Sequence, residues 1–173
     1  MDLPVNSTVE GIVWPAVPTR QAANRLGTLF QLEQSQWWPV HELQRFQFRQ
    51  LNFLIRYAKQ YVPYYRDALS GISVNQLFDS ESWRELPVLT RDDLQRAGAA
   101  LRTKGLPPEH GKVYLQRTSG STGKPVETMQ SDMNRFFWNV LTLRDMHWHR
   151  LDMSKSIAVI RHLQNLTADQ KGG

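Results

Sequence analysis

This chain contains no cysteine. That absence excludes disulfide bonds and thiolate metal sites. No stretch approaches the roughly 18 consecutive apolar residues that a membrane-spanning helix needs. The opening MDLPVNSTVE places an acid where a secretory signal carries positive charge, and no apolar segment follows it. We therefore expect a soluble, cytoplasmic protein that is not bound to a membrane.

Long basic runs are also absent, although the chain has 21 Lys and Arg against 16 Asp and Glu, a net charge of +5. A basic balance permits a nucleic acid, an anionic membrane or a phosphorylated small molecule as partner. Because the basic residues are scattered, with no run of about five or more, they give little support to a nucleic-acid arm, and we expect no nucleic acid partner. Six Trp among 173 residues exclude a disordered chain.

The N-terminal part is predicted to differ from the rest. Residues 1–35 are interpreted as an extended arm, with Trp14 as its anchor and a short helix around Leu26, Leu29 and Phe30 as the alternative for residues 21–35. The remainder, 36–173, is interpreted as a domain.

The first half of that domain has helical periodicity. Apolar side chains recur every three or four residues from Val40 to Val62, which predicts a long amphipathic helix that begins near Pro39 and stops before Pro63. A short helix over PYYRDAL follows. Thr90 with Asp93 three residues later predicts a capping box at the start of another helix. Asp92 and Asp93 then form a helix-start pair and not an acid–base couple, because adjacent residues of a helix point in different directions.

After this helical part, the spacing of the apolar residues changes to that of β-strands. Residues 112–117 and 126–130 are predicted strands, and Ser131 is a predicted N-cap for a helix that continues to Trp148. The apolar run in 156–161 is typical of a strand buried on both faces, which needs neighbouring strands and covering helices. We therefore expect an α/β or α+β fold whose sheet is incomplete in this chain. A compact α+β domain that completes itself is the alternative.

The segment RTSGSTGKPVE, 117–127, lies between the two predicted strands. The segment is not a Walker loop, because Gly120 and Gly123 are closer together than the two glycines of that motif and Pro125 follows Lys124. A plain flexible turn and a mobile phosphate clamp remain. In the clamp, glycines allow close backbone approach, four hydroxyls donate hydrogen bonds and a lysine adds charge. The candidate residues are Thr118, Ser119, Gly120, Ser121, Thr122, Gly123 and Lys124.

Four blocks carry a resemblance to a known family. YAKQYVPYYRDAL, LPVLTRDDLQ, RTSGSTGKPV and a helix with Arg144 four residues before Trp148 occur in this order. Together they resemble the phenylacetate–CoA ligase and capsular polysaccharide biosynthesis branch of the adenylate-forming superfamily, over roughly residues 40–165. No counterpart is expected for residues 1–35.

The resemblance implies an activity. The loop residues would grip the β- and γ-phosphates of ATP, assisted by Mg²⁺, while a carboxylate attacks the α-phosphorus to form an acyl-adenylate. CoA is a common acceptor of the acyl group in this family. Many members continue the loop as Pro-Lys-Gly, whereas this chain has Pro125, Val126 and Glu127.

The family's adenine, magnesium and ribose motifs and its catalytic lysine lie downstream of the residues present. No catalytic residue or metal ligand is therefore assigned here, and the carboxylate is unidentified. We expect the chain to be an N-terminal part of a ligase, inactive alone and prone to self-association through the unpaired strand. A non-catalytic remnant that binds an anion or a partner is the alternative.

Several other residues invite a functional interpretation. His147 and His149 point about 200° apart on a helix, so they are not expected to share a metal ion. For Arg144 the alternatives are contact with a phosphate and a structural pair with Asp145 or Glu127, and we favour the structural pair. Trp37 and Trp38 are expected in the core or against the arm, Tyr64 and Tyr65 between the long helix and the sheet, and His162 on a surface loop.

Overall fold

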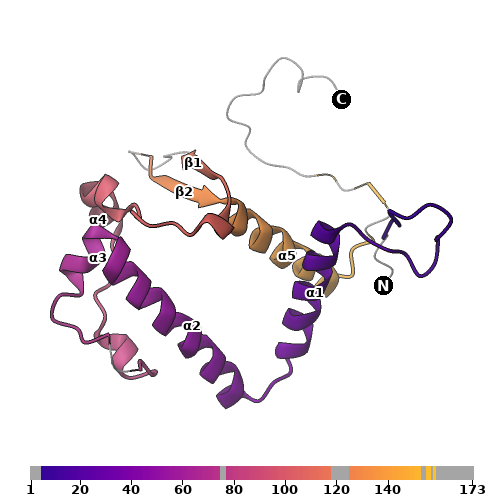
Figure 1. The fold of residues 1–173 in the computed structure, drawn as a ribbon. Helices are drawn as coiled ribbons and strands as arrows, with labels where there is room; N and C mark the ends of the chain where they lie inside the picture. Colours follow the sequence, from indigo (N-terminus) through magenta and orange to yellow (C-terminus); the bar gives the residue numbers. More distant parts are fainter. Residues whose placement is uncertain (1–4, 75–76, 118–124, 153–154, 157, 159–173) are drawn as a thin grey trace.

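The computed structural model describes residues 5–74, 77–117, 125–152, 155, 156 and 158. The fold is helix-rich α+β, with one antiparallel two-stranded hairpin in the described part of the chain. This confirms the α+β form of the predicted fold class. In Figure 1 the chain runs from α1 through α2 to a cluster of short helices, then through the hairpin of β1 and β2 into α5.

Helix α1, Arg20–Ser35, occupies the second half of the segment predicted as an extended arm. The prediction of an arm over all of 1–35 was therefore wrong for residues 20–35, where the alternative of a helix holds. The physical reason is the N-cap: the Thr19 side chain accepts the Ala22 N–H at 3.1 Å and starts the helix. Trp14 does not anchor the arm, because 86% of it is exposed.

Helix α2, Val40–Tyr61, confirms the predicted long amphipathic helix, with Pro39 as its N-cap. It ends because Val62, which precedes Pro63, is extended. Helix α3, Pro63–Ala68, follows at once with proline in its first turn.

A hydrophobic core forms where α2 meets α3 and the loop after it. Ile55, Leu69 and Phe78 are buried, and the neighbouring apolar side chains pack around them. These neighbours are Tyr65, Ile72, Val74, Trp83 and Leu86.

Polar contacts fasten the loop after α3 to α2. Asn52, itself buried, accepts the Phe78 N–H at 2.8 Å and donates to the Phe78 carbonyl at 3.3 Å. The Arg56 Nε donates to the Val74 carbonyl at 3.0 Å, and the Lys59 ammonium donates to the Ile72 carbonyl at 2.7 Å. The loop's carbonyls therefore obtain partners from one face of the helix.

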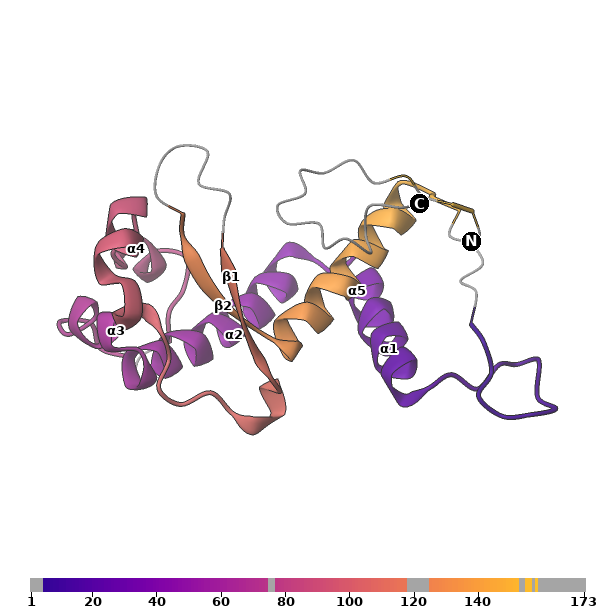
Figure 2. The ribbon, with the colours of Figure 1, turned by 90° about the horizontal axis from the view of Figure 1, so that it is seen from above.

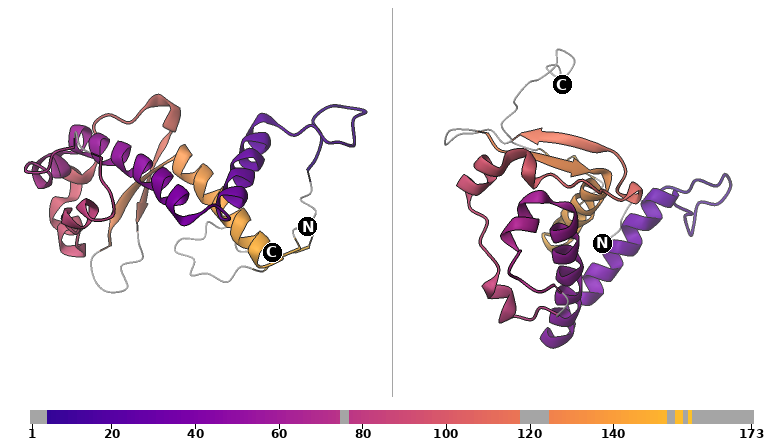
Figure 3. Two further views of the ribbon diagram at one scale, coloured as in Figure 1. Left: turned by 90° about the horizontal axis from the view of Figure 1, so that it is seen from below. Right: turned by 60° about the vertical axis from the view of Figure 1, so that its left-hand side comes forward.

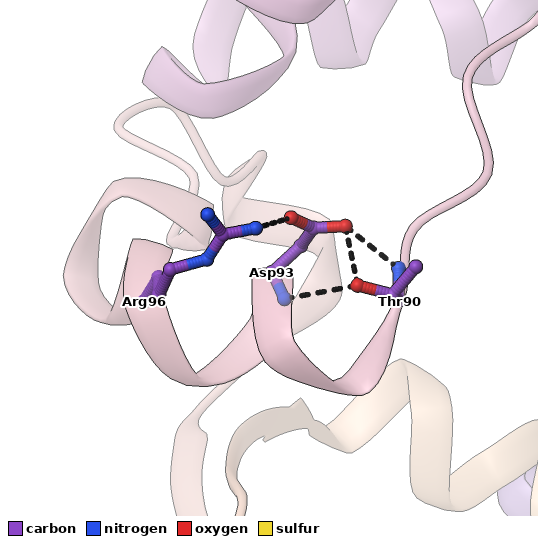
Figure 4. A network of polar contacts seen from close by, with 3 residues as sticks. All are labelled: Thr90, Asp93 and Arg96. Carbon is purple, nitrogen blue, oxygen red and sulfur yellow. Dashed lines mark hydrogen bonds and ion pairs between the residues drawn. The ribbon is translucent and has the colours of Figure 1, made fainter.

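Short elements lead from this core to the hairpin. They are η1, Ser82–Glu85, α4, Arg91–Ala97, η2, Gly98–Leu101, and η3, Pro108–His110. The predicted capping box of α4 is present: the Thr90 hydroxyl accepts the Asp93 N–H while the Asp93 carboxylate accepts from Thr90 (Figure 4). The same carboxylate pairs with Arg96.

The hairpin consists of β1, Val113–Arg117, and β2, Glu127–Ser131, close to the predicted strands. Helix α5, Asp132–Trp148, begins at the end of β2, and the predicted cap at Ser131 is confirmed, with Asn134 completing a capping box. Figure 2 shows α3 and α4 gathered at one end of the molecule and α1 against α5 at the other, with the hairpin between them. The views in Figure 3 agree.

Helices α1 and α5 pack against each other. Leu29 on α1 and Val140 on α5 are buried, 3% and 0% exposed. His147 Nδ1 lies 2.7 Å from the Glu33 carboxylate, and the Trp148 indole N–H donates to Gln36 at 3.0 Å. The predicted strand at 156–161 lies largely outside the described residues; Ser156 and Ala158 belong to neither helix nor strand.

Candidate functional site

The candidate phosphate loop lies between two paired strands. The register runs from Val113 opposite Ser131 to Arg117 opposite Glu127. All seven predicted site residues, 118–124, lie outside the described residues, but both flanks are described. Because Thr128 and Met129 belong to β2, a continuous helix from the loop into this region is excluded.

A network of ion pairs lies where the two strands meet the candidate loop. Arg117 Nε and Nη2 lie 2.8 and 2.7 Å from Glu127 Oε1, and Arg102 Nη2 lies 3.2 Å from Glu127 Oε2. One carboxylate therefore bridges two guanidinium groups, one from β1 and one from the residue after η2. The three side chains remain 67%, 38% and 50% exposed for Arg117, Glu127 and Arg102.

Arg102 is held in place by contacts of its chain neighbours with α2. The Tyr57 hydroxyl lies 2.8 Å from the Thr103 hydroxyl and donates to the Gly105 carbonyl at 3.0 Å. The Lys104 N–H donates to the Tyr61 carbonyl at 2.8 Å. The segment after η2 is thus tied to the end of α2, and Arg102 faces the hairpin from there.

The other end of the hairpin is fixed to α5. The Lys112 N–H donates to the Asp132 carboxylate at 2.9 Å, and the Asp132 N–H donates to the Lys112 carbonyl at 3.0 Å. Gly111 has φ +73°, and a Cβ there would clash with the Asp132 side chain, so glycine is required. The hairpin therefore has a firmly attached end and an end that leads into the candidate loop.

A cavity of about 580 Å³ opens between β2 and the short helices. Its walls combine apolar side chains such as Val62, Leu94 and Met129 with the charged pair Arg102 and Glu127. Tyr65, predicted to pack between the long helix and the sheet, lines this cavity and borders the core.

A second cavity, about 630 Å³, lies between α2 and residues 77–80. It shares no residue with the hairpin. Its walls include Phe53, Phe78 and the guanidinium-bearing Arg49 and Arg56. It is a separate basic and apolar surface, which a test of anion binding must distinguish from the hairpin.

The remaining candidates have structural roles. The Arg144 guanidinium lies 4.7 Å from the centre of the Trp148 ring, so its predicted pairing with Asp145 or Glu127 was wrong; Glu127 takes Arg102 and Arg117 instead. His147 pairs with Glu33 and His149 lies 3.6 Å from Asp145. Within the described ranges, no group of three His, Asp or Glu side chains could hold a metal ion.

The tryptophan pair after α1 differs from expectation. Trp37 is 81% exposed, so its predicted place in the core or against the arm was wrong, whereas Trp38 is 40% exposed and its ring centre lies 5.1 Å from that of Phe46. Of the two adjacent rings, Trp38 therefore contacts α2 through Phe46, whereas Trp37 is left in solvent.

Sequence reasoning did not predict this network, since it offered Arg144 as a partner for Glu127 and named neither Arg117 nor Arg102. Arg117 stands beside the predicted loop and Glu127 begins the second strand, so their pairing follows from the hairpin register. Arg102 lies 25 residues before Glu127 in sequence. No periodicity or motif links the two residues, and the attachment of the segment after η2 to α2 brings them together.

No helix among the described segments is long and apolar enough to span a membrane. Neither a protein-family model nor a curated protein matches the sequence.

Proposed function

We propose that this chain carries the triphosphate-binding loop of an AMP-forming carboxylate ligase similar to the phenylacetate–CoA ligases. Residues Thr118 to Lys124 take the β- and γ-phosphates of ATP, and an unidentified carboxylate is the second substrate. CoA is the acceptor that the resemblance implies. The observation that supports the proposal is that this polar segment follows Arg117, the last residue of β1, and precedes Glu127, the first residue of the paired strand β2.

In this proposal the chain's own residues act by electrostatics. Hydroxyl and backbone N–H donors orient the phosphate oxygens, and Lys124 and the nearby arginines offset charge that builds on the leaving pyrophosphate. Mg²⁺, when bound, would neutralise phosphate charge. The described residues provide no ligand set for it, so no step is assigned through a metal here.

The test is pyrophosphate binding to the purified chain, measured by calorimetry. Lys124→Ala should weaken binding roughly tenfold, because one charge-assisted contact is lost. Lys112→Ala is the matched control, since Lys112 lies just before β1 at the opposite end of the hairpin. Equal effects of the two substitutions would contradict the proposal.

A second measurement separates a ligase from a binding module. ATP–pyrophosphate exchange is assayed with a panel of aryl and alkyl carboxylates, on this chain and on any longer form that the coding sequence extends to. Exchange that requires Lys124 supports the ligase. Lys124-dependent binding without exchange in the longer form favours the non-catalytic alternative.

A further inference from the structure

Glu127 is shared by two arginines that come from different parts of the fold. Its Oε1 accepts from Arg117 across the hairpin, and its Oε2 accepts from Arg102 beside η2 at 3.2 Å. Each carboxylate oxygen is therefore occupied by a separate guanidinium. The three groups carry a net charge of +1 with Glu127 in place, and +2 once its carboxylate is withdrawn.

These ion pairs are accessible to solvent. Arg102 and Arg117 are at least half exposed, and Glu127 is 38% exposed. Ion pairs at such exposed positions contribute little to stability, because water and salt compete with them. An incoming anion can therefore take either guanidinium from Glu127 at small cost to the fold.

The geometry is that of an anion site already filled by an internal carboxylate. A guanidinium offers paired N–H donors in a plane, which suits phosphate oxygens as well as carboxylate oxygens. Two guanidiniums that already reach one carboxylate are close enough to reach neighbouring phosphate groups of one polyphosphate. The cavity beside β2 is bordered by Arg102 and Glu127, so the site is open to a ligand from that side.

The position of the two arginines beside the candidate loop matters as much as their charge. Arg117 and Glu127 form the paired rung of the hairpin next to residues 118–126. Arg102 is brought to this rung by the attachment of Thr103, Lys104 and Gly105 to α2. The two arginines thus hold positive charge at the base of the hairpin's connection through contacts that lie wholly within the described residues.

We propose that Arg102 and Arg117 form an anchor for a polyphosphate anion, and that Glu127 occupies this anchor as an internal competitor when no ligand is bound. The inference rests on the proposed function for the identity of the ligand, because it takes the polyphosphate to be the one that Thr118–Lys124 also contact. It adds two binding residues and a regulatory carboxylate to that function. The source of the polyphosphate is either a nucleoside triphosphate or free pyrophosphate.

The experiment measures pyrophosphate, ATP and AMP binding to the full chain and its variants by calorimetry. Glu127→Gln removes the competitor and should tighten pyrophosphate binding about threefold to tenfold, whereas Arg102→Gln and Arg117→Gln should each weaken it by a similar factor. Arg102→Lys keeps the positive charge without the paired N–H donors of the guanidinium, so its affinity for pyrophosphate should lie between those of the wild type and Arg102→Gln. Circular dichroism checks that each variant is folded.

The ion pair between Glu42 and Arg45 on α2 supplies matched controls. Its Glu is 39% exposed, nearly the same as Glu127, and its shortest distance is 2.7 Å. Glu42→Gln and Arg45→Gln change the net charge in the same way and should leave binding unchanged. Equal effects of Glu42→Gln and Glu127→Gln would overturn the anchor, since the effect would then follow net charge alone.

Ligand choice provides the remaining outcomes. Similar affinities for ATP and pyrophosphate with much weaker AMP binding support polyphosphate recognition, and ATP binding well above pyrophosphate binding identifies the nucleotide as the source. AMP binding equal to ATP binding overturns the anchor.

The proposed function and the anchor can fail separately. If Lys124→Ala abolishes pyrophosphate binding while Glu127→Gln and Arg102→Gln change nothing, the anchor is wrong and the proposed function stands. If Glu127→Gln and Arg102→Gln shift binding while Lys124→Ala does not, the anchor stands and the loop assignment is wrong.

Discussion

Asn52 and Phe78 are joined by two hydrogen bonds across 26 residues of sequence: the Phe78 N–H donates to Asn52 Oδ1 at 2.8 Å, and Asn52 Nδ2 donates to the Phe78 carbonyl at 3.3 Å. Asn52 is 4% exposed and Phe78 is 8% exposed. The side-chain amide thus pairs with both backbone polar groups of Phe78, as a neighbouring strand would. These bonds hold the loop against α2, beside the core that includes Ile55.

Replacing Asn52 should therefore destabilise the fold. Asn52→Ala leaves the buried Phe78 N–H without this partner, and we expect a loss of about 1–3 kcal/mol in the free energy of unfolding. Urea denaturation followed by circular dichroism measures it. Gln50→Ala, at an exposed position of the same helix, is the control and should have little effect. Equal losses of stability in the two variants would show that the hydrogen bonds between Asn52 and Phe78 do not stabilise the fold.

The contact between α1 and α5 should depend on one buried leucine. Leu29→Ala removes a side chain that is 3% exposed, and the expected cost is about 2–5 kcal/mol. Its neighbour Phe30 is 62% exposed, so Phe30→Ala should cost much less. Denaturant unfolding of both variants tests the packing of α1, and a larger loss from Phe30→Ala would contradict it.

The capping box of α4 should make stability depend on pH. Hydrogen bonds from the Thr90 side chain and backbone, and then the contact with Arg96, hold the pKa of the Asp93 carboxyl below its ordinary value of 3.8. Because the folded pKa is the lower one, the stabilisation is complete above the unfolded-state pKa and is lost as the pH falls through the folded pKa.

Asp93→Asn should therefore flatten the fall in stability below about pH 4, the region where an unfolded-state Asp carboxyl titrates. Thermal unfolding at a series of pH values measures this dependence. Asp92→Asn is the control, because Asp92 lies in the same first turn but outside the capping box. An unchanged pH profile in Asp93→Asn would rule out a contribution from this carboxylate.

Local signals in the sequence predicted the elements that depend on nearby residues. The spacing from Val40 to Val62 and the proline after it gave α2, and Thr90 and Ser131 marked the two capping boxes. Exposure was predicted less well. Trp14 was expected to anchor the arm and Trp37 to lie in the core or against the arm, yet both are mostly exposed, in connections outside the helices and strands.

Contacts between distant residues could not be predicted in the same way. The α1–α5 contact of Glu33 with His147 joins residues 114 apart, and the Arg102 contact with Glu127 depends on how the segment after η2 is attached to α2. Neither pair has a sequence period or motif. The candidate loop itself was recognised from composition and resemblance, and its binding role stays a prediction.

Charge should dominate any binding at the hairpin. Since the two arginines are at least half exposed and Glu127 is 38% exposed, raising the salt concentration should weaken pyrophosphate binding progressively, as screening shortens the range of the attraction. Calorimetry at several ionic strengths measures the slope. Affinity that does not depend on salt would indicate a buried, non-electrostatic site instead.

Binding of a polyphosphate by the hairpin connection and its base is tested most directly by amide NMR during a pyrophosphate titration. Saturable shifts are expected in residues 117–127 and near Arg102, and they should be reduced in Lys124→Ala and retained in Lys112→Ala. Shifts that are absent, or that gather instead around Arg49 and Arg56 on α2, would contradict it.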